Sequence, residues 1–296
     1  MGKSNFWFKK CYWFFIIALV INFNGNIVNE SDQLSKNRGF LFGDAVFESF
    51  RLISGTIIFW EDHYFRLMAS MRILRFDIPE NFTADFLKKE TLKLNYQINN
   101  GLDARIRITV YRSSEGRYKP KSNSVSFIIN LETLDSSNYS IGQNTVIVDL
   151  YKDFFISNQL IHSIKSNNKS INVLASIFAA ENELDNCILL NNNKKVCEFI
   201  NGNLFYVKEN KIYTPNLQSG CLNGVLRKNL IKIIKLTELS IEETDISPFD
   251  LVSADELFIT NVIQGIVPVT NYRKKKFDIE ISSKLINLLN DSVSYS

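Results

Sequence analysis

The stretch HSIKSNNKSINVL, residues 162–174, places Lys165 three residues before Asn168 and directly ahead of an apolar run. The run has helical spacing and predicts a helix from Ser170 to Asn182 with one apolar stripe, formed by Ile171, Leu174, Ile177 and Phe178. A lysine in a partly desolvated site beside other cations loses its proton more readily and can then attack an aldehyde. By itself Lys165 is far more typical of a surface lysine in a polar loop, so the other motifs of the chain decide its role.

Those other motifs stand on both sides of the lysine. Downstream come VCEFINGNLFYV (196–207), LNGVLR (222–227) and ELFITNVIQGIVPV (256–269), and upstream come NRGFLFGDAVFESFRL (37–52) and EDHYFRL (61–67). In this order the motifs resemble the pyridoxal-phosphate enzymes of the class-IV aminotransferase family, over residues 21–272 of the chain. The resemblance implies an enzyme that uses pyridoxal 5′-phosphate and acts on a small amino-acid-like substrate.

The resemblance also implies a fold. Members of the family have the fold-type-IV architecture, an α+β fold in which a small α+β domain precedes a larger domain with a barrel-like sheet and the cofactor lies between them. We therefore expect a small domain over residues 21–133, a linker over 134–140 and a larger cofactor-binding domain over 141–296. Family members are homodimers with residues of the partner chain near the pocket, so we expect a homodimer.

Pyridoxal phosphate needs a Schiff-base lysine, a carboxylate at the pyridine nitrogen, a phosphate cradle and exclusion of water. The resemblance assigns the lysine to Lys165 and the carboxylate to Glu198, which precedes Asn203 at the family's spacing. A carboxylate at the ring nitrogen keeps that nitrogen protonated, so that the ring can accept electrons. Phe199 and Ile200 are bulkier than the residues usual in the family, which predicts a changed shape on the substrate side.

The phosphate cradle is predicted at a helix start. Gly224 precedes a predicted helix over residues 225–236, whose first free N–H groups can bind a dianion with help from the helix dipole. Thr260 can add a hydroxyl, and Arg66 resembles the family arginine that reaches the same phosphate. The family usually has PGITR where this chain has NGVLR, so a threonine hydroxyl is lost while the backbone groups remain. The expected cofactor-binding residues are Arg66, Glu198, Asn203, Val225, Leu226 and Thr260.

Two reactions of the family remain open. Aminodeoxychorismate lyases eliminate pyruvate from 4-amino-4-deoxychorismate and leave 4-aminobenzoate for folate synthesis, whereas branched-chain transaminases move an amino group from an aliphatic amino acid to 2-oxoglutarate. YRSSEGRY (111–118) places Arg112 and Arg117 as the bacterial lyases do, and guanidinium groups bind carboxylates well. Asn261 matches a lyase position credited with substrate recognition.

Further features favour the lyase. Lys169 stands where branched-chain transaminases carry a tyrosine, and NGVLR is closer to the lyase version of its motif. A D-amino-acid transaminase fits less well, because the arginine-x-histidine carboxylate clamp of that group is missing. Arg107 is a further candidate for holding a carboxylate. The expected substrate-binding residues are therefore Arg107, Arg117 and Asn261.

Local patterns predict most of the helices and strands. Asn24-Gly25 predicts a type I′ hairpin turn, and Ser54-Gly55 predicts a second hairpin. Asp62 can cap a helix that ends before Pro79, and a second helix is predicted over residues 83–96. Strands are predicted over residues 104–111, 124–131, 144–150, 187–190, 204–207, 211–214 and 256–259, with Glu198 between two of them.

The composition is that of a globular protein, with 45% hydrophobic and 22% charged residues. A net charge of +3 is too small to indicate nucleic-acid binding. The four cysteines form no CxxC pair, which indicates a reducing compartment and predicts a cytoplasmic protein. His63 and His162 have no carboxylate or thiol neighbours at ligand spacing, so we expect no metal site.

Residues 1–20 form an extension ahead of the first predicted hairpin. Lys3, Lys9 and Lys10 precede an uncharged run from Cys11 to Ile21, which is similar to the first two regions of a signal peptide. The run is shorter than the roughly 20 residues that a helix needs to span a bilayer, and no small-x-small cleavage site follows it. We expect a mis-assigned translation start or a disordered extension, with an export signal or membrane anchor as the alternative.

Overall fold

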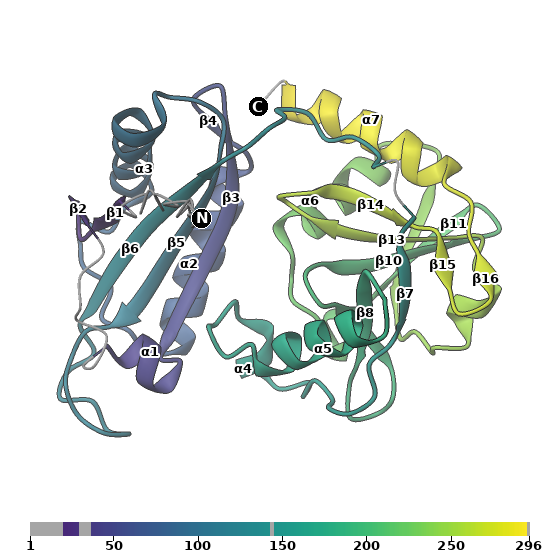
Figure 1. Ribbon diagram of the computed structural model, residues 1–296, viewed down its shortest axis with the longest axis horizontal. Coiled ribbons are helices and arrows are strands. Elements are labelled where there is room, and N and C mark those ends of the chain that lie inside the picture. Colours follow the sequence, from purple (N-terminus) through teal and green to yellow (C-terminus); the bar gives the residue numbers. More distant parts are fainter. Residues whose placement is uncertain (1–19, 30–36, 143–144, 295–296) are drawn as a thin grey trace, which may run out of the picture.

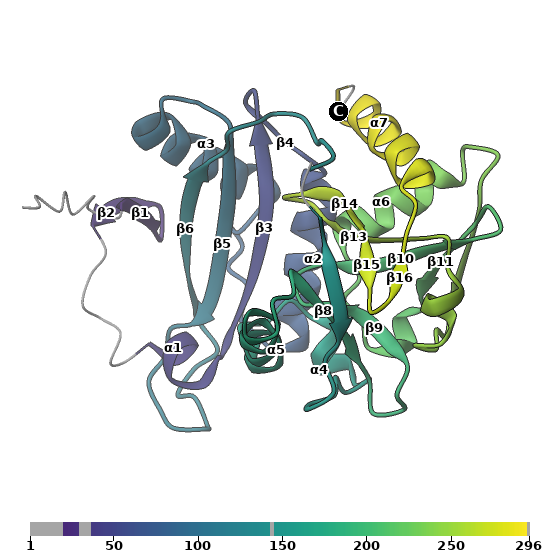
Figure 2. The ribbon, with the colours of Figure 1, turned by 45° about the vertical axis from the view of Figure 1, so that its right-hand side comes forward.

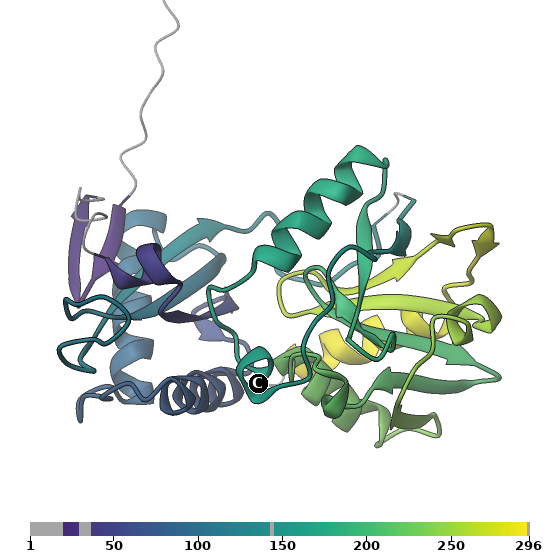
Figure 3. The same ribbon diagram turned by 90° about the horizontal axis from the view of Figure 1, so that it is seen from below.

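The computed structural model describes residues 20–29, 37–142 and 145–294, which form two β-sheets lying side by side (Figures 1 and 3). The elements of the first half are β1 (Val20–Phe23), β2 (Asn26–Asn29), α1 (Arg38–Phe42), β3 (Ala45–Ile53), β4 (Thr56–Ile57), α2 (Trp60–Ile73), α3 (Ala84–Asn99), β5 (Ala104–Arg112) and β6 (Val125–Thr133). The expected extension lies, except for its last residue, outside the described residues.

The elements of the second half are β7 (Ile147–Leu150), α4 (Leu160–Ser163), α5 (Ser170–Glu181), β8 (Asn186–Leu190), β9 (Val196–Phe199), β10 (Asn203–Lys208), β11 (Lys211–Pro215), α6 (Val225–Ile234), β12 (Ser240–Thr244), β13 (Glu256–Asn261), β14 (Gly265–Val269), β15 (Asn271–Tyr272), β16 (Lys275–Lys276) and α7 (Glu280–Ser294). Two short 3₁₀ helices lie at Leu217–Ser219 and Asp250–Ser253.

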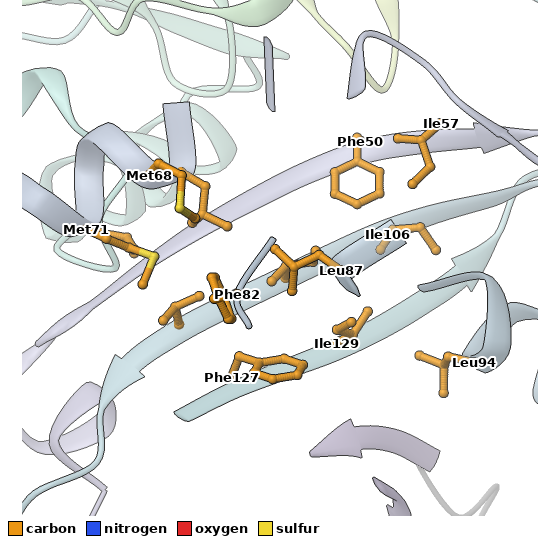
Figure 4. Packing of buried hydrophobic residues seen from close by; sticks show 14 of the residues in the cluster. Phe50, Ile57, Met68, Met71, Phe82, Leu87, Leu94, Ile106, Phe127 and Ile129 are labelled. Carbon is orange, nitrogen blue, oxygen red and sulfur yellow. The ribbon is translucent and has the colours of Figure 1, made fainter. Parts of the chain in front are cut away.

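The first sheet is antiparallel, in the order β2-β1-β6-β5-β3-β4. Along β5, Ile106, Ile108 and Val110 are fully buried, as the alternating pattern predicts. Their face packs against α2 and α3, where Phe50, Met68 and Leu87 meet in one apolar core (Figure 4). Arg105 and Arg107 alternate with these residues and lie on the opposite face of β5, whereas Arg112 at the end of the strand is buried in an ion pair with Asp44. The predicted hairpin turn at Asn24-Gly25 is confirmed, since both residues have positive φ angles, 52° and 87°.

Helix α2 does not begin as predicted. Its N-cap is Phe59 in a left-handed conformation, with no side-chain cap, so Asp62 lies inside the first turn. The Asp62 carboxylate instead accepts hydrogen bonds from Lys228 Nζ at 2.6 Å and Asn229 Nδ2 at 2.7 Å, both on α6. The prediction that Asp62 caps the helix was wrong because a tertiary contact more than 160 residues away uses its carboxylate. This contact joins the two halves of the molecule beside the cleft.

The second sheet closes on itself. Strand β7 pairs with β8, and the pairing continues through β9 and β10 to β13 and β14. Strands β14 and β15 are separated only by Thr270, and β15 returns to β7, which closes the circuit. The barrel-like sheet implied by the resemblance is therefore present. Helices α6 and α7 pack on one side of it, and α5 packs against β8 (Figure 2).

The predicted helix over residues 170–182 is confirmed as α5, and its predicted apolar stripe is confirmed in part. Ile171 and Phe178 are partly buried and pack against the core. Ala175 and Ala179 are the buried residues, packed in the core cluster that includes β8. Leu174 and Ile177 are 41% and 49% exposed. The small alanines allow the helix to approach the sheet closely, and Leu174 and Ile177 turn partly outward.

Residues 134–142 cross from the first sheet to the second along α7 (Figure 1). Tyr139 is buried there, with its hydroxyl donating to Val262 O at 2.7 Å and its ring 4.5 Å from the Arg51 guanidinium. The crossing segment thus packs against both halves. Among the described residues, no helix has the length and apolarity that crossing a membrane requires.

Replacing Glu256 with alanine is expected to lower the free energy of unfolding by about 2–4 kcal/mol. The buried Glu256 carboxylate caps α7, accepting from Ile281 N–H at 2.5 Å and from Ser282 N–H and Oγ at 2.9 and 2.8 Å. The substitution leaves these donors unpaired. Urea denaturation measures the change, and Glu238→Ala, at an exposed position, serves as the control. Equal stability of the two variants would contradict the capping role.

Candidate active site

A cavity of about 550 Å³ lies between the two sheets. Its wall is formed by β3, α2 and β5 on one side and by the lysine segment, β9, β10, the start of α6 and the β13–β14 turn on the other. Nearly all the predicted site residues line it, namely Arg66, Arg107, Lys165, Glu198, Asn203, Val225, Leu226, Thr260 and Asn261. Motifs that are far apart in the sequence therefore converge on one site.

Lys165 is fixed by backbone pairing with the first sheet. Phe47 N–H donates to Lys165 O at 2.8 Å, and Asn167 N–H donates to Ala45 O at 3.0 Å. The Lys165 amine lies 4.6 Å from the centre of the Phe47 ring. Burial, followed by the positive charge of Arg66, lowers the pKa of Lys165 to about 7. At neutral pH a large share of this amine is therefore unprotonated and nucleophilic.

Glu198 lies on β9 rather than between strands, directly opposite Asn203 of β10. Its Oε2 accepts from Leu222 N–H at 2.9 Å, while Asn203 Nδ2 donates to Leu222 O at 2.7 Å. Glu198 and Asn203 thus bind the backbone N–H and the carbonyl oxygen of Leu222, which fixes the turn that leads into α6. Burial raises the pKa of the Glu198 carboxyl, so a cationic partner in the cavity would restore its charge.

The start of α6 provides an anion site. Its N-cap, Gly224, has no side chain to satisfy the first N–H groups of the helix, those of Val225 and Leu226 among them, which line the cavity. Thr260 Oγ1 is buried beside them and makes no hydrogen bond among the described residues. Arg66 reaches the same place, donating to Asn223 O at 3.0 Å. Free N–H groups, an unpaired hydroxyl and a guanidinium are the groups that hold a phosphate.

Replacing Gly224 with alanine is expected to weaken cofactor binding at least about tenfold. A Cβ there would lie 2.0 Å from Asn203 Oδ1, so either Asn203 or the start of the helix must shift. The dissociation constant for pyridoxal phosphate measures the effect. Gly142→Ala is the matched control, because a Cβ at Gly142 meets nothing within 4 Å. Unchanged affinity for pyridoxal phosphate in both variants would show that the start of α6 does not bind the phosphate.

The sequence did not identify Glu48 and His63, which support Arg66. Arg66 Nε and Nη2 donate to the two oxygens of Glu48 at 2.6 and 2.7 Å, and His63 Nδ1 lies 2.7 Å from Glu48 Oε2. Burial alone would raise the pKa of Glu48, but Arg66 and His63 lower it to about 2. The three-residue step from His63 to Arg66 in EDHYFRL was the available signal, since it places both on adjacent turns of a helix.

Of the three predicted substrate-binding residues, two line the cavity and one does not. Arg107 lines the cavity with its guanidinium 3.7 Å from the centre of the Phe47 ring. Asn261 also lines it, with Oδ1 accepting from Gln264 N–H at 2.8 Å across the β13–β14 turn. Arg117 is not among the residues around this cavity and lies on an exposed loop. Arg112 is buried in an ion pair with Asp44.

The residues around the cavity fit pyridoxal phosphate: a lysine of lowered pKa, a buried carboxylate and a set of groups that can hold a phosphate. Residues 45–272 match the family described as amino-transferase class IV. The chain belongs to the class-IV aminotransferase family. Enzymes of this family use pyridoxal phosphate.

Individual relatives carry different activities. A Methanocaldococcus jannaschii protein named "Putative branched-chain-amino-acid aminotransferase" is 30% identical over 277 residues, which cover 90% of this chain and 89% of the relative. An aminodeoxychorismate lyase from Vibrio harveyi is 25% identical, over 79% of this chain and 85% of the relative. The PLP form of a branched-chain aminotransferase from Thermobaculum terrenum superposes with a TM-score of 0.80 at 22% identity, over 93% and 94% of the two chains.

The amine of Lys165 is expected to capture aldehydes at a rate that rises with pH up to about 7 and then levels off. Only the unprotonated amine reacts, and its pKa of about 7 lies well below the ordinary lysine value of 10.5. The rate of formation of the visible absorbance band with pyridoxal, which lacks the phosphate, measures this. A rate that keeps rising to pH 10 would show an ordinary lysine.

Proposed function

We propose that this class-IV enzyme is a 4-amino-4-deoxychorismate lyase. The observation that carries the proposal is the positive charge of the cavity lining, apart from the residues expected to bind the cofactor. Arg105, Arg107 and Lys169 all line the cavity, and Arg105 and Arg107 project from the same face of β5. The two carboxylates of aminodeoxychorismate suit three cations, as would those of 2-oxoglutarate in the transaminase reaction. The aliphatic amino acid of that reaction, in contrast, needs apolar walls.

In this proposal each residue of the cavity has its own role. Pyridoxal phosphate, when bound, supplies a ring that withdraws electrons from the substrate. Lys165 acts as the base and acid that moves a proton on the substrate, which its lowered pKa permits near neutral pH. Glu198 holds the proton of the ring nitrogen, and the arginines of β5 bind the carboxylates. Arg117 keeps a place in the proposal only if its exposed loop moves toward the cavity or a partner chain brings it there.

A branched-chain transaminase is the second candidate. The observation that favours it is the 30% identity with the Methanocaldococcus protein over nearly the whole of both chains. Apolar residues of the cavity lining, among them Phe47, Ile200 and Ile263, could contact an aliphatic substrate.

The absorbance of the bound cofactor separates the two candidates. Protein reconstituted with pyridoxal phosphate is mixed with L-glutamate or L-leucine, without any keto acid. A transaminase converts the cofactor to its amine form in one turnover, and the visible band disappears. The lyase proposal predicts that the band persists with both amino acids, and its rapid loss with either would overturn the proposal.

We also propose that the protein is a homodimer. Apolar side chains of α5, those of Val173, Leu174 and Ile177, are exposed in the single chain, as is Phe40 of α1. Covering such residues stabilises an interface. Light scattering of the purified protein should give twice the mass of 34.1 kDa, and a mass of one chain at micromolar concentration would contradict the proposal.

A further inference from the structure

His63 has a ring nitrogen without a partner inside the cavity. The side chain is fully buried and lines the cavity, and Nε2 makes no hydrogen bond to any described residue. Its other nitrogen, Nδ1, is engaged by Glu48 at 2.7 Å. A buried polar atom without a partner is costly, so a ligand that fills the cavity is expected to supply one.

The proton positions follow from the neighbours of His63. Glu48 is ionised because Arg66 pairs with both its oxygens, and an ionised carboxylate only accepts hydrogen bonds. Nδ1 must therefore carry the hydrogen. When the ring is neutral, Nε2 therefore accepts hydrogen bonds. Nε2 can donate a hydrogen bond only when the ring is protonated to the imidazolium.

A phosphate dianion cannot satisfy such an acceptor. The charged groups that act on His63 are Glu48 from β3, Arg66 from α2 and Lys165 from the segment before α5. Arg66 also reaches the anion site at α6, which brings a phosphate group close to this network. A dianion has no hydrogen to donate to Nε2, so either the ring or the phosphate must be protonated for the two to bond.

We infer that His63 shares one proton with the phosphate of the cofactor, so that binding of the phosphate ester takes up a proton from solution. The proton lies between Nε2 and a phosphate oxygen, whichever of the two groups formally holds it. Since phosphate monoesters are dianions well above pH 6, each pH unit above about 7 then weakens binding roughly tenfold through this group. The inference concerns the phosphate and holds for either reaction.

Titration calorimetry tests the inference on the cofactor-free full-length chain. Pyridoxamine 5′-phosphate is the probe, because it has the phosphate but no aldehyde to react with Lys165. Titrations at pH 7.5 in two buffers of different ionisation enthalpy give the protons taken up per ligand. We expect the uptake to be larger by about one proton in the native protein than in His63→Gln, which has a neutral side chain at this position. Equal uptake in the two proteins would overturn the inference.

Magnetic resonance decides the question if His63→Gln does not fold. The chain has only two histidines, and His162→Gln, at an exposed position of α4, assigns their resonances and serves as the control. At pH 7.5 the probe should move the His63 ring signals to the imidazolium position or leave the bound phosphorus signal at the monoanion position. A neutral ring beside a dianionic phosphate would contradict the inference.

Discussion

Replacing Lys165 with alanine is expected to abolish the visible absorbance of the bound cofactor and to lower turnover at least about 1,000-fold. The amine has two roles, because it binds the cofactor covalently and moves the substrate proton. Its position is fixed by the backbone hydrogen bonds of Lys165 and Asn167 to β3.

The absorbance spectrum and the steady-state rate measure the two roles separately. Lys88→Ala, at an exposed position of α3, is the control and should leave both unchanged. Full activity of Lys165→Ala would remove this residue from the chemistry, even if the variant still bound the cofactor without a covalent bond.

Replacing Glu198 with glutamine is expected to lower kcat by about 10- to 100-fold while the cofactor stays bound. A hydrogen bond to a charged group contributes about 1.5–3 kcal/mol, and each 1.4 kcal/mol is a factor of ten in rate. Glutamine keeps the size of the side chain, and its oxygen can still accept from Leu222 N–H, so the turn before α6 should persist.

The kcat, the cofactor dissociation constant and the absorbance maximum should all be measured for this variant. A fall in kcat with nearly unchanged affinity indicates that the charge of Glu198 acts on the ring nitrogen. Loss of affinity with an unchanged kcat would instead assign Glu198 to holding Leu222. Glu238→Gln, at an exposed position, controls for loss of a negative charge.

Most of the fold could be predicted because its local patterns agree with its long-range contacts. The alternation along β5 and the helical period of α3 are local properties that the sheet and its core then use unchanged. The long-range arrangement, with its barrel-like second sheet, was implied by the family resemblance that the ordered motifs carry. Asn168 of the lysine motif is an example, since its side-chain oxygen would clash with a Cβ at Gly43 and therefore packs against the glycine of a distant motif.

What could not be predicted depends on partners far away in the chain. Asp62 has the chemistry of a helix cap, but Lys228 and Asn229 give its carboxylate a stronger set of partners than the helix start does. The stripe on α5 has the right period, but only Ile171 and Phe178 of it pack against the core, beside the fully packed Ala175 and Ala179. The spacing of His63 and Arg66 places them on adjacent turns of one helix, but their shared partner Glu48 lies on another element, which the spacing does not show.

The central claim, elimination of pyruvate by a class-IV site, is tested most directly by its products. Protein reconstituted with pyridoxal phosphate is supplied with 4-amino-4-deoxychorismate alone, and pyruvate, 4-aminobenzoate and the cofactor spectrum are measured together. We expect equal amounts of the two products, many turnovers per site and a cofactor that remains in its aldehyde form. Absence of both products from protein that binds the cofactor through Lys165 would contradict the account.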